Sequence, residues 1–209
     1  MVNKKISNKS WQTDISRLFI ELLERNPDAR LAILGVGNEL AGDDAIGNMV
    51  ARNLMSLIDH PGQSDRLVIL DGGLAPESFI GKLEAFLPDI ILILDAADLH
   101  AAPGFVKLMG MCQVPGSLPS THSLSLNVLT HYLRYSVTCD IYFLGIQPDT
   151  LEFDTQLSPI ARETVKEITQ FLHRLIEKPG FYREDMISSM LQNNNQYVEL
   201  ERNRKWLKY

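Results

Sequence analysis

Two hydrophobic patterns alternate along the chain: short continuous apolar runs, and apolar residues repeated at helical spacing. The continuous runs are typical of buried strands, and the helical spacing indicates amphipathic helices. The predicted strands lie at residues 30–35, 66–71, 90–95, 104–109 and 140–145. The predicted helices lie at residues 14–24, 43–58, 76–86, 123–135 and 158–177. Alternation of strands and helices predicts an α/β fold with a mostly parallel sheet covered by helices.

The strand at 104–109 is expected to differ from the others. The connection before it is too short for a crossover helix, so it is predicted to be an antiparallel strand at the edge of the sheet. The 209 residues suffice for one core, and we expect a single domain at residues 29–178. Residues 1–28 would form an N-terminal helical extension, and the polar, charged segment 179–209 an accessory tail.

Charge and composition narrow the classes of partner. The formal net charge of -6 argues against a nucleic-acid partner, which needs a basic surface. No apolar run is long enough to cross a bilayer, and the N-terminus lacks the apolar core of a signal peptide. The two cysteines, Cys112 and Cys139, form no CxxC pair and are predicted to be buried thiols. These features predict a cytoplasmic protein without membrane insertion.

Four ionisable residues follow strand ends or begin helices. Asp71 and Asp95 end their strands, Asp44 follows the first strand, and His122 precedes a helix. The carboxyl ends of parallel strands form one edge, where ligands commonly bind, so these side chains are expected to converge there. Each also has a simpler interpretation. Asp43 or Asp44 could cap a helix, Asp71 could belong to a turn, and a lone histidine is usually an ordinary surface or capping residue.

The glycine-rich turn GVGNELAGDDAIG also resembles a nucleotide-binding loop. Leu40 stands where the third glycine of GxGxxG would be, and two aspartates would repel a phosphate at the helix N-terminus. No GxxxxGK[ST], HExxH or GxSxG motif occurs, so ATPase, zinc-protease and serine-hydrolase functions lack their usual signatures. Carboxylate and imidazole groups from separate elements are instead suitable ligands for a divalent metal such as zinc, nickel or cadmium.

Five motifs in order carry a resemblance to a known family: GVGNELAGDDAIG, LDGGLAPES, LILDAADLHAAPG, STHSLSL and FLGIQPDTLEF. Over about residues 31–176 the chain resembles the NiFe-hydrogenase maturation endopeptidases, and within them the branch that processes the large subunit of hydrogenase 3. The resemblance implies a three-layer α/β/α domain with a five-stranded twisted sheet. It also implies a metal-contacting triad of Asp44, Asp95 and His122, and a catalytic role for Asp71. The GIQPD turn at 145–149 would line the same cleft.

The resemblance further implies a reaction. The enzyme would remove a C-terminal extension from a hydrogenase large-subunit precursor after nickel insertion, and it would recognise nickel that belongs to this substrate. No permanent cofactor is then expected, although cadmium or zinc would occupy the site in vitro. The principal alternative is a non-catalytic metallocentre chaperone that binds nickel or the large subunit through the same acidic edge. A nucleotide-binding α/β enzyme is a second alternative.

Overall fold

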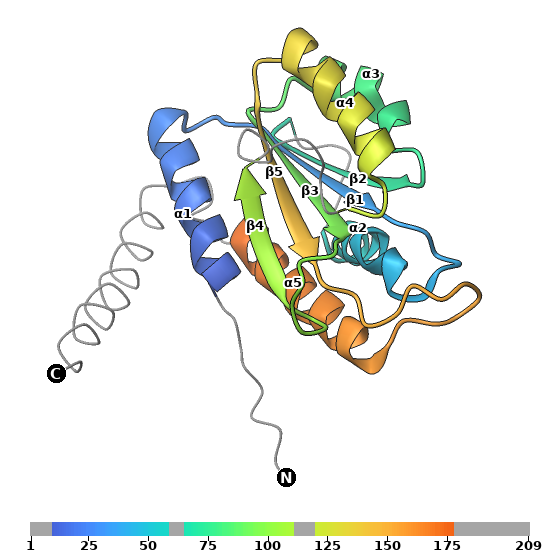
Figure 1. Cartoon of the computed structure of the whole chain (residues 1–209). Helices are drawn as coiled ribbons and strands as arrows, with labels where there is room; N and C mark the ends of the chain where they lie inside the picture. Colours follow the sequence, from blue (N-terminus) through green and yellow to red (C-terminus); the bar gives the residue numbers. More distant parts are fainter. Residues whose placement is uncertain (1–9, 59–64, 111–119, 178–209) are drawn as a thin grey trace, which may run out of the picture.

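A five-stranded sheet forms the middle layer of the molecule, with strand order β2-β1-β3-β5-β4 (Figure 1). The computed structural model describes residues 10–58, 65–110 and 120–177. The strands are β1 (Leu31–Val36), β2 (Leu67–Gly73), β3 (Ile90–Ala96), β4 (Val106–Gly110) and β5 (Asp140–Ile146). The helices are α1 (Ser10–Arg25), α2 (Ile46–Leu57), α3 (Ile80–Phe86), α4 (Ser123–Ser136) and α5 (Pro159–Glu177), with the 3-10 helices η1 (Gly42–Ala45) and η2 (Pro76–Phe79).

The sheet has the predicted mixture of strand directions. β2, β1, β3 and β5 are parallel, and β4 pairs antiparallel with β5 at the edge. The segment before β4 is too short to carry the chain back across the sheet through a helix, so β4 can only run antiparallel to its neighbour. The predicted mostly parallel five-stranded α/β/α domain is therefore confirmed.

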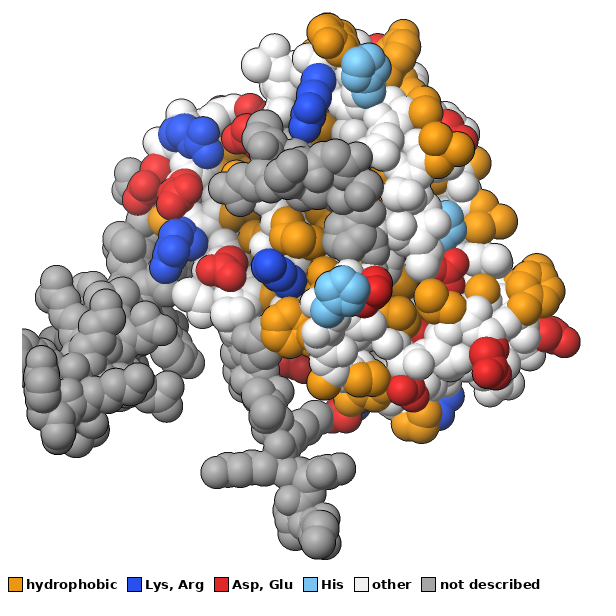
Figure 2. All heavy atoms as spheres, viewed as in Figure 1, with side chains coloured by type: hydrophobic (Ala, Val, Ile, Leu, Met, Phe, Trp, Pro, Cys, Tyr) orange, Lys and Arg blue, Asp and Glu red, His pale blue; other side chains and the backbone are white. Residues whose placement is uncertain are grey.

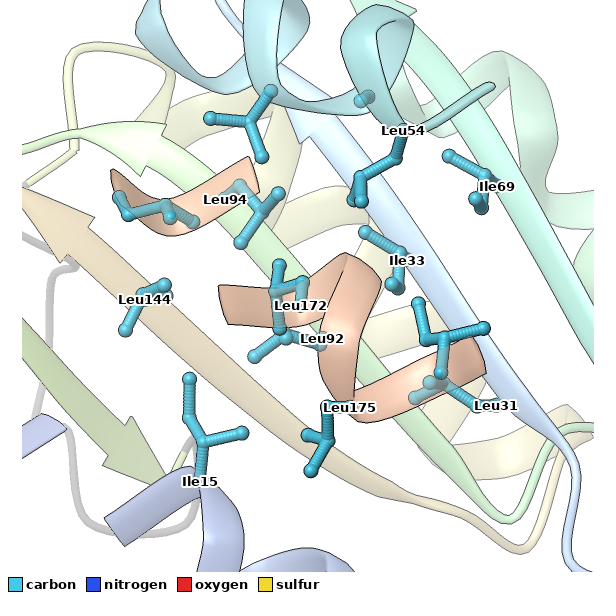
Figure 3. Packing of buried hydrophobic residues seen from close by; sticks show 14 of the residues in the cluster. Ile15, Leu31, Ile33, Leu54, Ile69, Leu92, Leu94, Leu144, Leu172 and Leu175 are labelled. Carbon is cyan, nitrogen blue, oxygen red and sulfur yellow. The ribbon is translucent and has the colours of Figure 1, made fainter. Parts of the chain in front are cut away.

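Alternate residues along each strand face two separate cores. One face of the sheet packs against α1, α2 and α5, and Figure 3 shows the leucine and isoleucine side chains that fill this layer. The opposite face packs against α3 and α4 through leucines such as Leu83 and Leu129. The strands read as continuous apolar runs because both of their faces are buried.

Helix α1 belongs to the first of these cores. Ile15 and Phe19 are fully buried, and the ring of Trp11 packs edge-on against Phe171 of α5 with the ring centroids 5.0 Å apart. The helix predicted at 14–24 thus exists, and it packs as part of the domain core. The segment predicted as a C-terminal tail, 179–209, lies outside the described residues.

Two further predictions concern the cysteines and the membrane. Cys139 is a free, partly buried thiol, and burial together with the charges of Asp140 and Asp89 raises its pKa to about 11. Cys112 lies outside the described residues. Among the described helices, none combines the length and the apolar character that crossing a bilayer requires.

Candidate functional site

Three of the four predicted side chains meet at the carboxyl edge of the sheet. Asp44 comes from η1, Asp95 from the end of β3, and His122 from the residue that precedes α4. His122 Nε2 lies 3.6 Å from an Asp44 carboxylate oxygen, and His122 Nδ1 lies 3.4 Å from an Asp95 carboxylate oxygen. One ligand atom from each residue lies within 4.8 Å of the other two, a spacing at which all three could hold one metal ion. We call Asp44, Asp95 and His122 the triad.

Asp95 is the most deeply buried member of the triad. Its side chain is fully inaccessible, and burial raises the pKa of Asp95 although His122 and Ser120 oppose this by stabilising the charge. Oδ2 accepts a hydrogen bond from the Ser120 hydroxyl. Oδ1 accepts no hydrogen bond within the described residues, and its ionic neighbour is His122 Nδ1 at 3.4 Å. A buried carboxylate oxygen without a partner is costly unless a cation or donor approaches it.

Ser120 connects Asp95 to His122. Its hydroxyl donates to the Asp95 carboxylate and accepts the backbone N–H of His122 at 2.9 Å. Ser120 itself is fixed by a bridge to Ala97, two residues beyond Asp95. Sequence reasoning missed Ser120, although a serine three residues before the start of a helix is a typical local hydrogen-bonding pattern. Ser120 thus orients Asp95 and His122, but it is not itself a candidate metal ligand.

His122 is held between the two carboxylates. Its side chain is 10% exposed, and Thr121 Oγ1 lies 2.9 Å from Nδ1. Burial lowers the pKa of His122, but the close approach of Asp95 and the charges of Asp95 and Asp44 outweigh it, so that the pKa is raised above its usual value. The negative charges of Asp95 and Asp44 thus favour a proton on the His122 ring. A metal ion at this position would compete with that proton for the ring nitrogens.

Asp43 and Asp44 are adjacent in sequence but serve different structures. Asp44 Oδ2 accepts the backbone N–H of Asn38 at 3.1 Å, and its Oδ1 is buried without a partner. Asp43 instead accepts hydrogen bonds from the Ser158 backbone and hydroxyl and from the Asp149 backbone, at 2.7 to 2.8 Å. The sequence indicated a capping role for at least one of the pair. Asp43 takes a structural role of this kind, but it fixes the beginning of α5 rather than that of α2.

Glycines allow η1 and α2 to lie close to the strand ends. A Cβ atom at Gly35 would be 2.3 Å from the carbonyl oxygen of Gly47, and one at Gly47 would be 2.1 Å from the carbonyl oxygen of Leu94. A Cβ at Gly37 would be 2.0 Å from the carbonyl oxygen of Asp44. The glycine pattern of this motif therefore serves close backbone packing that places Asp44 beside β3.

Asp71 does not join the triad. It pairs with Gly35 of β1, which pairs in turn with Leu94 of β3, so Asp71 shares the sheet face of Leu94. Asp95 is the next residue after Leu94 and points to the other face. β2 and β3 are separated by β1, which places the two strands about 10 Å apart. The catalytic role predicted for Asp71 stays a prediction.

Asp71 has a cationic partner on its own face. Arg52 of α2 donates from Nε to Asp71 at 2.5 Å, and its Nη2 pairs with Glu39 in the loop after β1. Hydrogen bonds to Glu39 and Asp71 raise the pKa of Arg52, and the bond to Arg52 lowers that of Glu39. We call Arg52, Asp71 and Glu39 the arginine cluster. Arg52 thus neutralises Asp71 locally, whereas the triad carboxylates face the imidazole of His122.

The predicted GIQPD turn supports the surrounding loops. The Gln147 side chain accepts the backbone N–H groups of Leu99 and Ala101, at 2.7 and 3.3 Å. Two residues later, the Asp149 N–H binds Asp43. This turn thus fixes both the loop after β3 and the segment that carries Asp44.

Comparisons with known proteins show to which family the chain belongs. The model of the hydrogenase maturation protease family matches residues 49–174. The chain belongs to this family. It is 32% identical to a putative hydrogenase maturation protease of Methanocaldococcus jannaschii, over 71% of this chain and 87% of that protein. It is 29% identical to the hydrogenase 3 maturation protease of Escherichia coli K12, over 71% of this chain and 92% of that protein.

Solved structures support the same assignment. The crystal structure of a NiFe hydrogenase maturation protease from Thermococcus kodakarensis aligns with a TM-score of 0.67 and 27% identity, covering 77% of this chain and 99% of that one. The solution structure of an endopeptidase from Escherichia coli aligns with a TM-score of 0.59 and 28% identity, covering 74% and 99%. The predicted class of enzyme, a hydrogenase maturation endopeptidase, is therefore confirmed.

Proposed function

We propose that this maturation protease removes the C-terminal extension of a NiFe-hydrogenase large-subunit precursor, and that it recognises nickel already bound to that substrate. The observation that carries the proposal is the triad, in which Asp44, Asp95 and His122 converge at one edge. Two of its carboxylate oxygens, Asp44 Oδ1 and Asp95 Oδ1, are buried without hydrogen-bond partners. A divalent cation at this position would compensate both of them.

The types of donor suit nickel. Imidazole is a good ligand for borderline metals such as nickel and zinc, and carboxylates complete such sites. Three protein ligands leave coordination positions open for groups of another molecule. Nickel that enters with the substrate can thus keep its own ligands while it contacts the triad. Cadmium and zinc fit the same donors and would compete with nickel in vitro.

Binding through the metal makes nickel insertion a condition for cleavage. A precursor without nickel would present no cation to the unpartnered carboxylates, so it would dissociate before the peptide bond is cut. The free energy of the metal contacts is used for substrate selection, and the protease needs no permanent cofactor of its own.

Peptide hydrolysis then needs a base and an oxyanion stabiliser. Asp44 is our choice of base, because it is the more accessible of the two triad carboxylates: its side chain is 8% exposed, whereas that of Asp95 is 0% exposed. Asp44 would take a proton from water as the water oxygen attacks the scissile carbonyl carbon, and would return it to the departing amine. The substrate nickel or a backbone N–H would stabilise the oxyanion. Asp71 is less suited to this role, because Arg52 already binds it on the other sheet face.

The test is incubation of the protease with nickel-loaded and nickel-free precursor in parallel, followed by intact mass measurement. We expect shortening of the nickel-loaded precursor alone. His122→Ala should abolish this shortening, whereas Asp98→Ala should not, because Asp98 is an exposed carboxylate three residues from Asp95. Equal cleavage of both precursors would contradict recognition of nickel. Stable binding without any change of mass would favour the metallocentre chaperone instead.

A further inference from the structure

Large hydrophobic side chains are exposed at the carboxyl edge of the sheet, which also carries the triad. Leu40 and Leu74 are each 57% exposed, Leu124 is 79% exposed, and Leu151 and Phe153 are 46% and 68% exposed. We call these five residues the apolar rim. Figure 2 shows hydrophobic side chains on the right of the molecule, where the long loop that follows β5 lies.

The rim residues come from separate segments that meet at one edge. Leu40 follows β1, Leu74 follows β2, and Leu151 and Phe153 follow β5. Leu124 lies in the first turn of α4, two residues after His122. These segments are joined by backbone hydrogen bonds. Asp154 donates to Leu40 at 2.6 Å, and Gly37 donates to Gly73 at 3.1 Å. The five rim residues therefore lie at the carboxyl edge of the sheet, the edge that carries the triad, although they span more than a hundred residues of sequence.

Access to the triad requires contact with the rim. The side chains of Asp95, Asp44 and His122 are 0%, 8% and 10% exposed. A metal ion carried by another protein can reach them only if that protein lies against the surrounding loops. A typical protein interface covers about 800 Å² on each partner, an area far wider than three side chains. The surface that delivers the metal must therefore cover rim residues as well.

We propose that the apolar rim is the docking surface for the folded body of the large-subunit precursor, an inference that rests on the proposed function. Exposed apolar residues gathered around a functional site are typical of protein interaction surfaces. A second copy of this chain is a poorer occupant, because it would cover the triad and exclude the substrate. Glu152 and Asp154 alternate with Leu151 and Phe153, so the complementary surface is apolar with basic residues opposite these carboxylates.

The experiment compares a rim variant with a control of the same chemistry. The rim variant carries Leu40→Ser, Leu124→Ser and Phe153→Ser. The control carries Leu57→Ser and Leu87→Ser, which replace leucines that are 49% and 57% exposed but precede β2 and β3 at the opposite edge of the sheet. Circular dichroism and thermal unfolding verify that both variants are folded. Processing rates are then measured against the concentration of nickel-loaded precursor.

We expect the rim variant to raise KM for the precursor by about tenfold or more while kcat changes less than about twofold, because docking is weakened and the triad is intact. The control should match the wild type. An unchanged KM in the rim variant, with normal processing by the wild type, would refute the docking surface alone. Absence of processing by the wild type would refute the proposed function instead. A wild-type dimer that the rim substitutions convert to monomer, with KM unchanged, would assign the rim to self-association.

Discussion

Asp95 and Asp71 end strands of the same parallel sheet, yet they belong to opposite kinds of site. Asp95 is fully buried, has one oxygen without a partner and faces a histidine and a second carboxylate. Asp71 is partly exposed and pairs with Arg52. The first arrangement leaves negative charge for an incoming cation to neutralise, whereas the second is already neutralised. Similar positions at strand ends therefore give a candidate metal site or a structural ion pair, depending on which sheet face the side chain enters.

The largest effect is expected at the triad. Asp95→Asn should lower the processing rate by about 100- to 1,000-fold, because the metal-contacting charge is lost. The variant should remain folded, with a melting temperature equal to or above that of the wild type, since burial raises the pKa of Asp95 and so disfavours its ionised form in the folded state. Intact mass and thermal unfolding measure the two quantities. Near-normal processing by Asp95→Asn would contradict the functional role of Asp95 that distinguishes it from Asp71.

Substitution of Asp43, which supports the segment that carries Asp44, should affect stability rather than the chemistry of the triad. Asp43→Ala should lower the free energy of unfolding by about 3 kcal/mol, because buried donors at Ser158 and Asp149 lose their acceptor. Asp44→Ala should change it by less than about 1 kcal/mol and abolish processing. Urea unfolding of both variants checks this. Equal stability of the two would show that Asp43 is no structural anchor.

The close packing of α2 on β1, the strand between Asp71 and Asp95 in the sheet, offers a third test. Gly35→Ala should lower the free energy of unfolding by about 2 kcal/mol, because its Cβ would collide with the Gly47 carbonyl. Gly81→Ala is the matched control. A Cβ at this helical position in α3 meets nothing within 4 Å, so the change should stabilise the protein by about 0.5 kcal/mol. Chemical unfolding compares them, and a harmless Gly35→Ala would contradict the close packing of α2 on β1.

A smaller effect is expected for Asp71. Asp71→Asn should lower kcat/KM by no more than about tenfold, because Asp71 lies on the other sheet face and contacts Arg52 rather than the triad. Steady-state kinetics with nickel-loaded precursor measure this. If kcat fell as far as in Asp95→Asn with KM unchanged, Asp71 would take part in the chemistry. The proposed difference between Asp71 and Asp95 would then be wrong.

The smallest effect is expected for the arginine cluster itself. Arg52→Met should lower the free energy of unfolding at pH 7 by less than about 1 kcal/mol, as is usual for exposed ion pairs. The hydrogen bond from Arg52 lowers the pKa of Glu39, so its stabilising effect is present above the ordinary glutamate pKa and is lost as the pH falls through the lowered value. Urea unfolding at pH 7 and pH 3 should therefore show a larger difference between variant and wild type at pH 7 than at pH 3.

The sequence was sufficient to predict the layers and the edge strand. Apolar runs marked the strands, and the short connection before β4 determined its direction. An acid after the run ILIL was correctly expected at a buried strand end. The convergence of Asp44, Asp95 and His122 also followed from their positions after strands or before a helix.

The remaining details depended on register and on contacts distant in sequence. The face that Asp71 enters follows from its pairing with Gly35, and no local pattern specifies how neighbouring strands align. The partners of Asp43 lie more than a hundred residues away, so a helix-capping interpretation was the natural one from local sequence. Ser120 gained its importance only from the bridge that places it beside Asp95.

The anchoring of Asp43 by Ser158 has a consequence for biosynthesis. The residue next to Asp43 can be fixed in the triad only after the chain has been synthesised through the beginning of α5. A ribosome-bound fragment that ends before Ser158 already contains every triad residue, but it lacks the anchor that holds Asp44 in place. We therefore expect the triad to take its final geometry only after the chain has been synthesised past Ser158.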